Sequence, residues 1–477
     1  MTIFTMRGVL VGLQLLSVVA SAAIDLTTRS VTSDLQGLIS SSSVEVTVRE
    51  RWNEVDAPVV AVVVSPLCEA DIKAVVKYVA QKKLPLVPQN GGNGWASFSL
   101  KGPAVILNLA GLNQVTVSAD KKSAVIGGGA IIQEVVAAAD AAGVLVMAGN
   151  CNCVGALGAG LGGGFGNLVG ELGMAVDNIL SLRVITPKGE AIDLSRTSNP
   201  DLFWAMRGAG PNFGVVTYAR VKAVPTSDRS AWLTALTFDG SRITDVAQAI
   251  QDMPLLPNQV VFFILANSGD ANNTPTVLVT GFLRQGNEAA GRKAFAPLYA
   301  LGPNTNSSSV APYTGWNAAN DFFCARGERK PAFHTSLSSM TASDWTAVWD
   351  LYVDFQKQPS AENSAILVEV YNYDKTKSVG RGATAVSDEL RFNSFAQAVA
   401  IPWYKDAALD THAFSFASQV RDIWASPNSA KTNPAYINFA HGDEDLTAIY
   451  GSSLPRLKTL KKKYDPTNVF GHWFSLA

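Results

Sequence analysis

The chain has 477 residues, of which 47% are hydrophobic and 16% are charged, and its formal net charge is −1. Because charges of both signs are dispersed and nearly balanced, the composition excludes a basic nucleic-acid binder and a protein held to an anionic membrane surface. This length fits two to four domains with well-packed cores.

The N-terminus is typical of a secretory signal peptide. A basic start at Met6-Arg-Gly precedes an apolar run from Val9 to Ala20, and Ala20-Ser-Ala22 offers small residues for cleavage. The apolar run is too short for the ~20 residues that a membrane span needs. We therefore expect residues 1–22 to be cleaved near Ala22, a secreted protein without a membrane anchor, and 23–56 as its N-terminal segment.

Secretion would permit glycosylation at the sequons of Asn272 and Asn306, and it would permit disulfides. Four cysteines allow three complete pairings, and their spacing does not choose among them. The four are Cys68, Cys151, Cys153 and Cys324. Cys151 and Cys153 are too close for an easy mutual disulfide, and a disulfide between Cys68 and Cys324 would bridge two domains.

From residue 57 to residue 226, strand and helix patterns alternate. Apolar residues at helical spacing predict helices, and short apolar runs predict strands. The expected helices are Glu69–Lys82, Ile131–Ala142 and Asp201–Arg207. The expected strands are Val59–Val64, Leu86–Val87, Val105–Leu109, Val115–Ser118, Ala124–Ile126, Ser181–Thr186, Ala191–Leu194 and Val215–Val221.

Three glycine-rich stretches, at residues 87–99, 127–129 and 155–166, interrupt this pattern. Seven of the twelve residues from Gly155 to Gly166 are glycine, a density that we expect to prevent a stable helix or a regular strand. Leucine and phenylalanine lie between these glycines, whereas flexible linkers are polar. Several separated backbone cradles predict an extended nucleotide ligand such as FAD, and the pattern differs from a nicotinamide fingerprint.

From residue 227 the pattern changes to alternating strands with two helices between them, which predicts a broad, mostly antiparallel sheet with helices on one face. The strands are expected at Trp232–Phe238, Val260–Ala266, Thr276–Leu283, Ala365–Tyr371 and Ala396–Pro402. The helices are expected at Ser241–Asp252 and Ala342–Gln356, and a final helix at Ser452–Tyr464.

At its motifs the chain resembles the FAD-linked oxidases of the berberine-bridge-enzyme-like group, in the vanillyl-alcohol-oxidase superfamily. The resemblance runs through Gly91-Gly92 and residues 149–178, 199–214, 435–439 and 464–470. It implies an α+β fold with a two-subdomain PCMH-type FAD-binding module over 57–226. A substrate domain would follow over 227–430, with one face of its sheet over the cofactor, and 431–477 would return to the FAD module.

The resemblance also predicts which residues bind FAD. They belong to the glycine-rich stretches, to the segment that follows them and to the C-terminal Tyr-x-Asn motif. They are Gln89, Asn90, Gly91, Gly92, Asn93, Gly94, Ser99, Gly128, Cys151, Val154, Gly155, Gly158, Gly162, Gly163, Gly164, Gly166, Asp177, Asn178 and Asn438.

Relatives commonly attach the flavin through a histidine and a cysteine. Asn93 stands at the histidine position, and an amide is no nucleophile, so a histidyl link is excluded there; Gln89 likewise replaces a common arginine. Cys151 stands at the cysteine position of Gly149-Asn-Cys-Asn-Cys-Val-Gly155. A thioether requires nearby N–H groups to lower the pKa of this thiol. FAD held without a covalent bond is the alternative, and Cys153 is expected to serve packing.

Flavin oxidation commonly needs a base for an O–H or N–H proton. Tyr436 is the first candidate, with Asn438 contacting flavin or substrate. Glu369 and Tyr371 share one face of their strand by the two-residue period, and an acidic residue on a comparable strand serves some sugar-oxidising relatives. A solvent-facing position is the alternative for Glu369. Gln397 lies in a segment where alkaloid-oxidising relatives carry a glutamate.

The four histidines lack the spacing of metal ligands, so no metal site is expected. His441 or His472 could approach the site, although structural roles are expected for all four, and Asp201 and Asn212 are expected to support helix starts and turns.

The resemblance implies an oxidase that transfers a hydride from an alcohol, amine or activated C–H to FAD and electrons to O2. The strand region that is expected to face the substrate has few of the charged residues that a sugar site would need, so an apolar secondary metabolite is favoured as the substrate. The protein is expected to be a monomer. The alternatives are a carbohydrate oxidase, a flavin-fold cyclase that forms rings, and a catalytically silent flavin-binding protein.

Overall fold

A computed structural model describes residues 29–39, 43–45, 50–425 and 434–477. The expected signal peptide at 1–22 lies outside these residues. The described part contains three sheets of three or more strands, each flanked by helices, and one two-stranded ribbon. Among the described helices, none is both long and apolar enough to cross a membrane.

The first sheet is built from short apolar runs. Its strand order is β1-β2-β4-β3, with β2, β4 and β3 parallel, and the helix α2 (Glu69–Lys82) connects β2 to β3. Ile72, Val75, Val76 and Val79 of α2 are buried, so the helical spacing in the sequence marks the face that packs on the sheet. The strands are β1 (Ser43–Glu45), β2 (Val60–Ser65), β3 (Leu86–Gln89) and β4 (Ala104–Asn108).

The second sheet is antiparallel, with order β5-β6-β10-β8-β9. The helices α3 (Ile132–Ala142) and α6 (Pro200–Ala209) lie where the sequence predicts them. Asp201 of α6 accepts hydrogen bonds from Lys463 and Tyr464, so it holds the C-terminal helix as well as its own. The strands are β5 (Val115–Val117), β6 (Ser123–Gly127), β8 (Ile179–Ile185), β9 (Ala191–Ser195) and β10 (Val215–Lys222). The ribbon pairs β7 (Val144–Leu145) with β11 (Val224–Pro225).

One expectation for this half is wrong. The glycine-rich stretch contains a helix, α4 (Ala156–Leu161), whose leucines Leu157 and Leu161 are buried in the main core. Burial of these side chains, together with small residues that let neighbours come close, outweighs the entropy cost of helical glycines. Two shorter helices follow, α5 (Val169–Leu172) and the 3-10 helix η2 (Ala175–Asn178).

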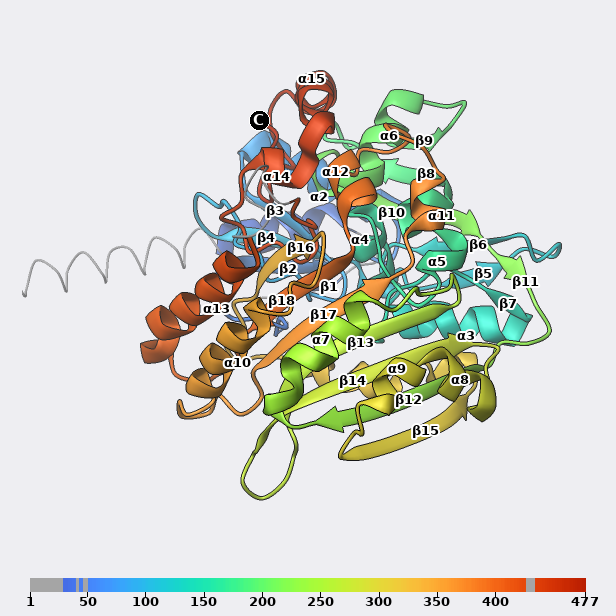
Figure 1. Cartoon of the computed structure of the whole chain (residues 1–477). Coiled ribbons are helices and arrows are strands. Elements are labelled where there is room, and N and C mark those ends of the chain that lie inside the picture. The colour runs from blue at the N-terminus through green and yellow to red at the C-terminus, as the bar shows by residue number, and fades with distance from the viewer. Residues whose placement is uncertain (1–28, 40–42, 46–49, 426–433) are drawn as a thin grey trace, which may run out of the picture.

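The third sheet has seven antiparallel strands in the order β15-β12-β14-β13-β17-β18-β16. Helices cover one face and bury a second core of apolar side chains against it (Figure 1). Those helices are α7 (Ile243–Gln251), α8 (Glu288–Ala294), α9 (Ala296–Ala300), α10 (Asp344–Phe355) and α13 (Asp410–Ala425). The strands are β12 (Ala231–Phe238), β13 (Gln259–Asn267), β14 (Pro275–Arg284), β15 (Thr305–Ala311), β16 (Phe333–Leu337), β17 (Ala365–Tyr371) and β18 (Ala396–Ile401).

The remaining elements join the two halves of the molecule, the glycine-rich half with the first two sheets and the sheet half with the seven-stranded sheet. The 3-10 helix η6 (Ala318–Cys324) leads to β16, while α11 (Asp374–Lys377) and α12 (Asp388–Asn393) connect β17 to β18. After the sheet, α14 (Leu446–Tyr450) and α15 (Leu454–Tyr464) bring the chain back beside α6 of the first half (Figure 1). The mixed α and β fold, with its large antiparallel sheet backed by helices, is therefore confirmed.

Candidate functional site

A cavity of about 380 Å³ lies between the glycine-rich loops and the sheet face that carries no helices. Most of the predicted FAD-binding residues line it, in four separate segments of the chain. They are Gln89, Asn90, Gly91, Gly92, Asn93, Gly94, Gly128, Cys151, Val154, Gly155, Gly158 and Asn438.

The first glycine loop needs its glycines for close approach. Gly92 has a φ of 72°, which favours glycine, and a Cβ at Gly91 would lie 2.7 Å from the Gly155 nitrogen and 2.8 Å from the Cys153 oxygen. Gly91 thereby lets two glycine-rich loops touch backbone to backbone. Asn93 of this loop lies at the same junction. In the orientation of its side-chain amide that satisfies both ends, the amide nitrogen donates to the carbonyls of Cys153 and Gly91. Asn93 therefore has a structural contact.

Two buried polar atoms at this loop lack a partner, and both residues line the cavity. The Asn90 amide nitrogen donates to the carbonyls of Gly128 and Ala130, which leaves Oδ1 as an unsatisfied acceptor. Arg51 donates to Gln89 Oε1 at 2.7 Å, which leaves Nε2 of Gln89 as an unsatisfied donor. A buried polar group without a partner is costly. The free donor on Gln89 and the free acceptor on Asn90 fit a polar ligand that has both hydrogen-bond acceptors and donors, as FAD has.

Arg51 is a site residue that the sequence reasoning missed. Its guanidinium lines the cavity and also donates to the Gly94 carbonyl, while Arg326 donates to the Gly91 carbonyl at 2.7 Å. Burial and the neighbouring charge of Arg326 lower the pKa of Arg51 to about 10, so it stays a cation at neutral pH. A positive charge thus reaches the loop from the N-terminal segment, although position 89 itself is neutral.

The later glycines of the main run do not line the cavity; Gly162 and Gly163 pack against the Tyr-x-Asn motif of the C-terminal segment, Gly164 packs against Ala175 and Gly166 against Ala148. A Cβ at Gly162 would collide with Asn438, and one at Gly163 would lie 3.1 Å from the Tyr436 ring. The Gly164 amide donates to the Tyr436 hydroxyl at 2.9 Å. Gly162, Gly163, Gly164 and Gly166 are therefore placed to admit neighbouring protein atoms, and their contact with the cofactor stays a prediction.

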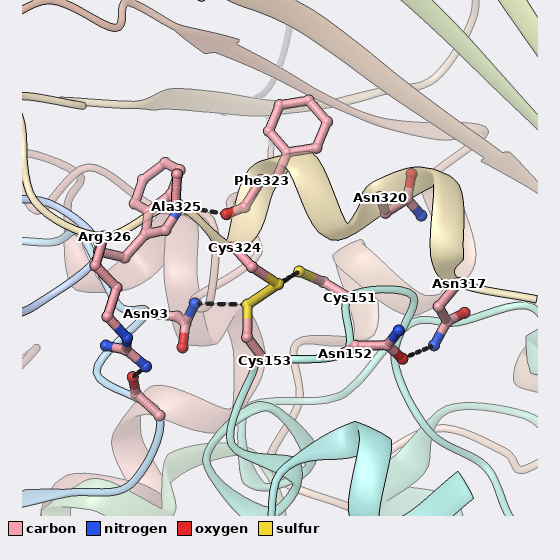
Figure 2. The surroundings of a disulfide bond; sticks show 12 residues. Asn93, Cys151, Asn152, Cys153, Asn317, Asn320, Phe323, Cys324, Ala325 and Arg326 are labelled. Atoms are coloured by element: carbon pink, nitrogen blue, oxygen red, sulfur yellow. Dashed lines mark hydrogen bonds between the residues drawn. A yellow bond between two sulfur atoms is a disulfide. The ribbon is translucent and has the colours of Figure 1, made fainter. Parts of the chain in front are cut away.

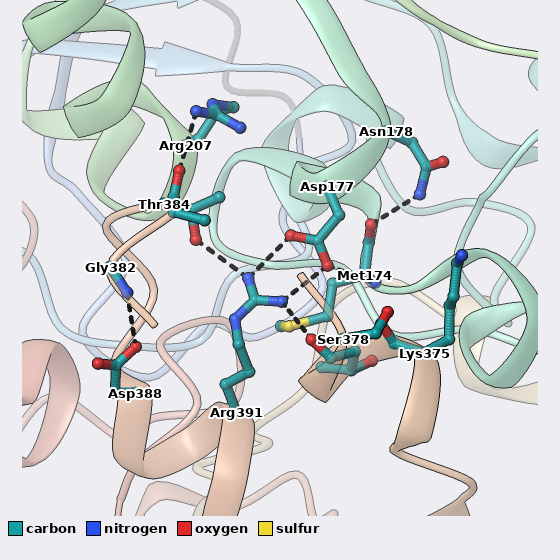
Figure 3. A network of polar contacts seen from close by, with 12 residues as sticks. Met174, Asp177, Asn178, Arg207, Lys375, Ser378, Gly382, Thr384, Asp388 and Arg391 are labelled. Atoms are coloured by element: carbon teal, nitrogen blue, oxygen red, sulfur yellow. Dashed lines mark hydrogen bonds and ion pairs between the residues drawn. The ribbon is translucent and has the colours of Figure 1, made fainter. Parts of the chain in front are cut away.

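Three other predicted cofactor residues also lie away from the cavity lining. Asp177 is buried and forms a bidentate ion pair with Arg391, both distances being 2.8 Å (Figure 3). The Asn178 side chain donates to the carbonyls of Leu172 and Met174. The Ser99 amide donates to the His472 carbonyl. Asp177 thus ties the glycine-rich half to the α12 segment of the sheet half.

The opposite wall belongs to the seven-stranded sheet. The strand register puts Glu369 of β17 opposite Phe262 of β13, and Leu367 opposite Val399 of β18, so these side chains share one face. The sheet contributes Phe262, Leu367, Val399 and Ile401 to the apolar lining, and Trp52, Trp95, Phe323 and Phe439 from other segments of the chain extend it. Glu369 is the one carboxyl group among the described residues that line the cavity.

Glu369 is buried, which settles the open alternative against a solvent-facing position. Tyr371 donates to its Oε2 at 2.7 Å and accepts a hydrogen bond from Asn150 at 2.8 Å. Burial raises the pKa of Glu369 to about 7, although the Tyr371 hydrogen bond opposes this shift. Tyr371 itself does not line the cavity; burial and Glu369 raise its pKa, so it is a hydrogen-bond donor to the carboxyl group.

Tyr436 lines the cavity on the glycine-rich side. Its hydroxyl oxygen accepts hydrogen bonds from the Gly164 amide and from Asn438 Nδ2, at 2.9 and 2.7 Å. Burial raises the pKa of Tyr436 to about 12, while these two bonds oppose the rise. With two donors already on its oxygen, the hydroxyl has its own proton available for a ligand in the cavity.

The histidines divide as expected, mostly into structural roles. His334 is buried, contacts Gln397 through Nε2 at 3.0 Å and accepts from the Tyr436 amide through Nδ1, and burial lowers its pKa to about 3. His441 stacks on Phe333. His472 lines the cavity, with its Nδ1 lying 3.1 Å from the Ser99 carbonyl.

The cysteines pair in a way that the sequence did not indicate. Cys153 and Cys324 form a disulfide, so Cys153 has more than a packing role and the considered bond between Cys68 and Cys324 is absent (Figure 2). Cys151 is a free thiol and lines the cavity. Burial raises its pKa to about 11, with Asp321 and Glu369 adding to the rise. The backbone N–H of Cys153 lowers this pKa, but burial outweighs it, so nearby N–H groups do not by themselves provide the lowered pKa that a thioether requires.

The sulfur atoms of Cys151, Cys153 and Cys324 lie within 4.8 Å of one another. Because two of them are bonded to each other, this group is a disulfide with a neighbouring thiol rather than a set of three thiolate ligands. The expectation that the protein has no metal site stays a prediction.

Two family profiles match the chain, "FAD binding domain" at residues 60–195 and "Berberine and berberine like" at 435–476. The FAD-linked oxidoreductase hasG of Aspergillus fumigatus is 31% identical over 92% of this chain and 97% of its own length. The FAD-linked oxidoreductase OXR1 of Pyricularia oryzae is 30% identical, covering 89% of this chain and 85% of its own.

Solved structures share the fold. BBE-like 1 of Physcomitrella patens has a TM-score of 0.78 at 21% identity and covers 91% of this chain and 96% of its own. The xylooligosaccharide oxidase of Myceliophthora thermophila has a TM-score of 0.78 at 22% identity, covering 95% and 99%. An FAD-binding profile, a C-terminal berberine-like profile and relatives matched over most of their length agree with the cradle described above: the chain belongs to the berberine-bridge-enzyme-like FAD-linked oxidoreductases.

Proposed function

We propose that the protein is an oxidase that removes a hydride from an alcohol, amine or activated C–H of an apolar small molecule, such as an aromatic secondary metabolite. FAD supplies the hydride acceptor when it is bound, and O2 is the proposed final electron acceptor. The observation that carries the substrate class is the sheet wall of the cavity, where aromatic and aliphatic side chains surround a single carboxyl group. Sugar recognition would need many hydrogen-bonding side chains on this wall.

Glu369 is the proposed base. A group whose pKa lies near the working pH accepts protons most effectively, and the pKa of Glu369 is about 7. The carboxyl lines the cavity, and Tyr371 fixes its orientation through Oε2. Tyr436, whose pKa is about 12, is assigned the role of a hydrogen-bond donor to the substrate. This reverses the order of the two candidates that the sequence indicated.

The FAD-binding residues of the first loop are assigned to the polar groups of the cofactor. Gln89 would donate through Nε2 and Asn90 would accept through Oδ1, since these are the atoms left without partners. Cys151 is the proposed attachment point, because its thiol lines the same cavity. Its raised pKa means that thioether formation needs the bound flavin to favour the thiolate.

Secretion after cleavage near Ala22 remains part of the proposal. The disulfide between Cys153 and Cys324 supports it, because disulfides persist in the secretory pathway and outside the cell and are rare in the cytosol.

The test uses the full chain expressed through a secretory host. Acid precipitation shows whether flavin stays with the protein, and peptide mass mapping shows whether Cys151 carries it. Anaerobic mixing with panels of aromatic alcohols, amines and polyketides, and of oligosaccharides, is followed by flavin bleaching, and O2 is then admitted to measure peroxide. Bleaching by the aromatic panel with peroxide release supports the proposal. Bleaching only by oligosaccharides would overturn the substrate class, and folded protein without flavin would overturn the oxidase.

A further inference from the structure

We propose that Cys151, Cys153 and Cys324 form a thiol–disulfide exchange site, in which the bond between Cys153 and Cys324 keeps the Cys151 sulfur free for the flavin. When Cys153 is not held in that bond, Cys151 takes its place and pairs with Cys324. The benefit to the cofactor rests on the proposed attachment at Cys151. The exchange itself rests only on the geometry of the three sulfurs.

The Cys151 sulfur is equally close to both halves of the disulfide. Its distances to the sulfurs of Cys153 and Cys324 are both 3.5 Å (Figure 2). The equal distances place it beside the S–S bond, whereas exchange needs attack along the bond axis. Cys151 must therefore rotate its side chain before it can react, so the described arrangement holds the thiol next to the disulfide without consuming it.

The exchange needs no outside oxidant. The thiolate of Cys151 attacks the sulfur of Cys324, a bond between Cys151 and Cys324 forms, and the bond between Cys153 and Cys324 breaks. Cys153 leaves as a thiolate and takes up the proton that Cys151 gave up. One thiol and one disulfide are present before and after. The alternative partner for Cys151 is disfavoured, because a bond to Cys153 would close a very short ring.

Only Cys151 of the three cysteines lines the cavity, so the isomers differ in what they offer the flavin. With Cys153 bonded to Cys324, a thiol faces the cavity. With Cys151 bonded to Cys324, that sulfur is already used, and the remaining thiol on Cys153 lies outside the lining. The bond between Cys153 and Cys324 therefore leaves the sulfur of the attachment cysteine, Cys151, available to the flavin.

Hydrogen bonds hold the two reacting segments together independently of the sulfurs. Asn320 of η6 donates to the Asn150 carbonyl at 2.9 Å, and Asn317 donates to the Gly149 carbonyl at 3.2 Å. The indole of Trp52 donates to the Phe323 carbonyl at 2.6 Å, and on the other side of Cys324 the guanidinium of Arg326 donates to the Gly91 carbonyl at 2.7 Å. Because these contacts flank both loops, Cys324 stays beside Cys151 when the disulfide changes partner, and variants that lack one sulfur are expected to fold.

Burial, Asp321 and Glu369 raise the pKa of Cys151 to about 11. At neutral pH the group is therefore almost entirely the thiol, which is unreactive toward disulfides. The isomer formed during folding thus persists long enough for the cofactor to bind.

The test compares Cys153→Ser, Cys324→Ser, the double variant and the control Cys68→Ser, all secreted as full chains. Non-reducing peptide mapping reports the disulfide, acid precipitation reports covalent flavin, and total flavin reports bound cofactor. Cys153→Ser is expected to contain a bond between Cys151 and Cys324, formed as disulfides of the oxidising secretory pathway are reduced, and to lose at least nine-tenths of its covalent flavin. The double variant and Cys324→Ser leave Cys151 without its disulfide partner, so both are expected to contain covalent flavin at the wild-type level. The control Cys68→Ser is expected to match the wild type.

Cys153→Ser with Cys324 as a free thiol and with flavin still on Cys151 would overturn the inference. Wild type that holds FAD without a covalent bond would overturn only the attachment proposed above, and the disulfide map of Cys153→Ser would still decide the exchange. If Cys153→Ser does not fold, wild-type protein secreted under riboflavin limitation, whose Cys151 carries no flavin, is incubated at pH 9 in a glutathione redox buffer and mapped. A bond between Cys151 and Cys324 supports the exchange there, and its absence contradicts it.

Discussion

The two walls of the cavity are built by different means. The glycine-rich wall presents backbone, amide side chains and the guanidinium of Arg51, from loops, the end of β3 and the helix α4. The sheet wall presents alternate side chains of three strands, which are apolar apart from Glu369. The first wall suits a cofactor with a fixed structure and many polar atoms. The second wall can change its side chains without disturbing the backbone, so substrate specificity can diverge while FAD binding is kept.

The sharpest way to break this comparison is to remove the carboxyl group of the sheet wall. Glu369→Gln keeps the size and the hydrogen bond from Tyr371 but removes the base, so the rate of flavin reduction is expected to fall 10²- to 10⁴-fold while FAD content stays unchanged. Stopped-flow reduction measures this. Tyr436→Phe is the matched variant from the other wall, with an expected loss of about tenfold for one hydrogen bond. A larger loss for Tyr436→Phe would move the base to the glycine-rich wall.

The two halves of the molecule that carry these walls are joined by the buried pair of Asp177 and Arg391. Arg391→Met leaves an uncompensated buried carboxylate and is expected to lower the free energy of unfolding by about 3–5 kcal/mol. Chemical denaturation of the FAD-bound protein measures this. The double variant Asp177→Asn/Arg391→Met should recover part of the loss. Arg292→Met breaks an exposed pair with Glu288 and should change stability far less, because solvent screens this pair. An equal loss in both single variants would contradict the role of the buried pair.

The pKa of Glu369 predicts how stability changes with pH. Its folded pKa of about 7 lies above the ordinary 4.5, so between these values the folded protein keeps a proton that the unfolded chain has released. The free energy of unfolding therefore falls as pH rises from 4.5 to 7, by up to about 3 kcal/mol from this group. Thermal unfolding of wild type and Glu369→Gln across this range should show the variant losing less. Parallel curves would show that Glu369 keeps an ordinary pKa.

The smallest expected effect concerns the cation on the glycine-rich wall. In a Cys151→Ala background, which excludes a covalent bond to flavin, Arg51→Met is expected to weaken FAD binding about 10- to 100-fold, because Gln89 loses the charged donor that orients its amide. Titration of the apoprotein by flavin fluorescence measures the dissociation constant. Arg292→Met in the same background serves as the control. Unchanged affinity in Arg51→Met would restrict the guanidinium to a role in folding.

Local sequence signals predicted the glycine-rich wall better than the sheet wall. The loops around Gly91 and Gly155 were found because backbone cradles need glycine in the sequence itself. By contrast, β15 was missed because an exposed edge strand of serine and threonine has no apolar alternation. The strand β16 was missed because its polar His334 and Ser336 are satisfied by distant residues, Gln397 of the neighbouring strand and, for His334, the Tyr436 amide.

Long-range contacts explain the remaining errors. The bond between Cys153 and Cys324 spans 171 residues, and no local pattern of either cysteine points to the other. Arg51 reaches Gln89 across 38 residues, from a segment without a motif. Asp177 follows the glycine run and was therefore assigned to the cofactor, whereas its partner Arg391 lies in the other half of the molecule.

The return of the C-terminal segment to the first half has a consequence for the order of assembly on the ribosome. Tyr436, Asn438, Phe439, Phe470 and His472 complete the cavity, and they follow every loop and strand of the other walls in the chain. Both halves can collapse during synthesis, but the cofactor cannot be enclosed until this segment has left the exit tunnel. Enclosure of the cofactor therefore waits for this segment, and a nascent chain arrested before Tyr436 would lack the residues that complete the cavity.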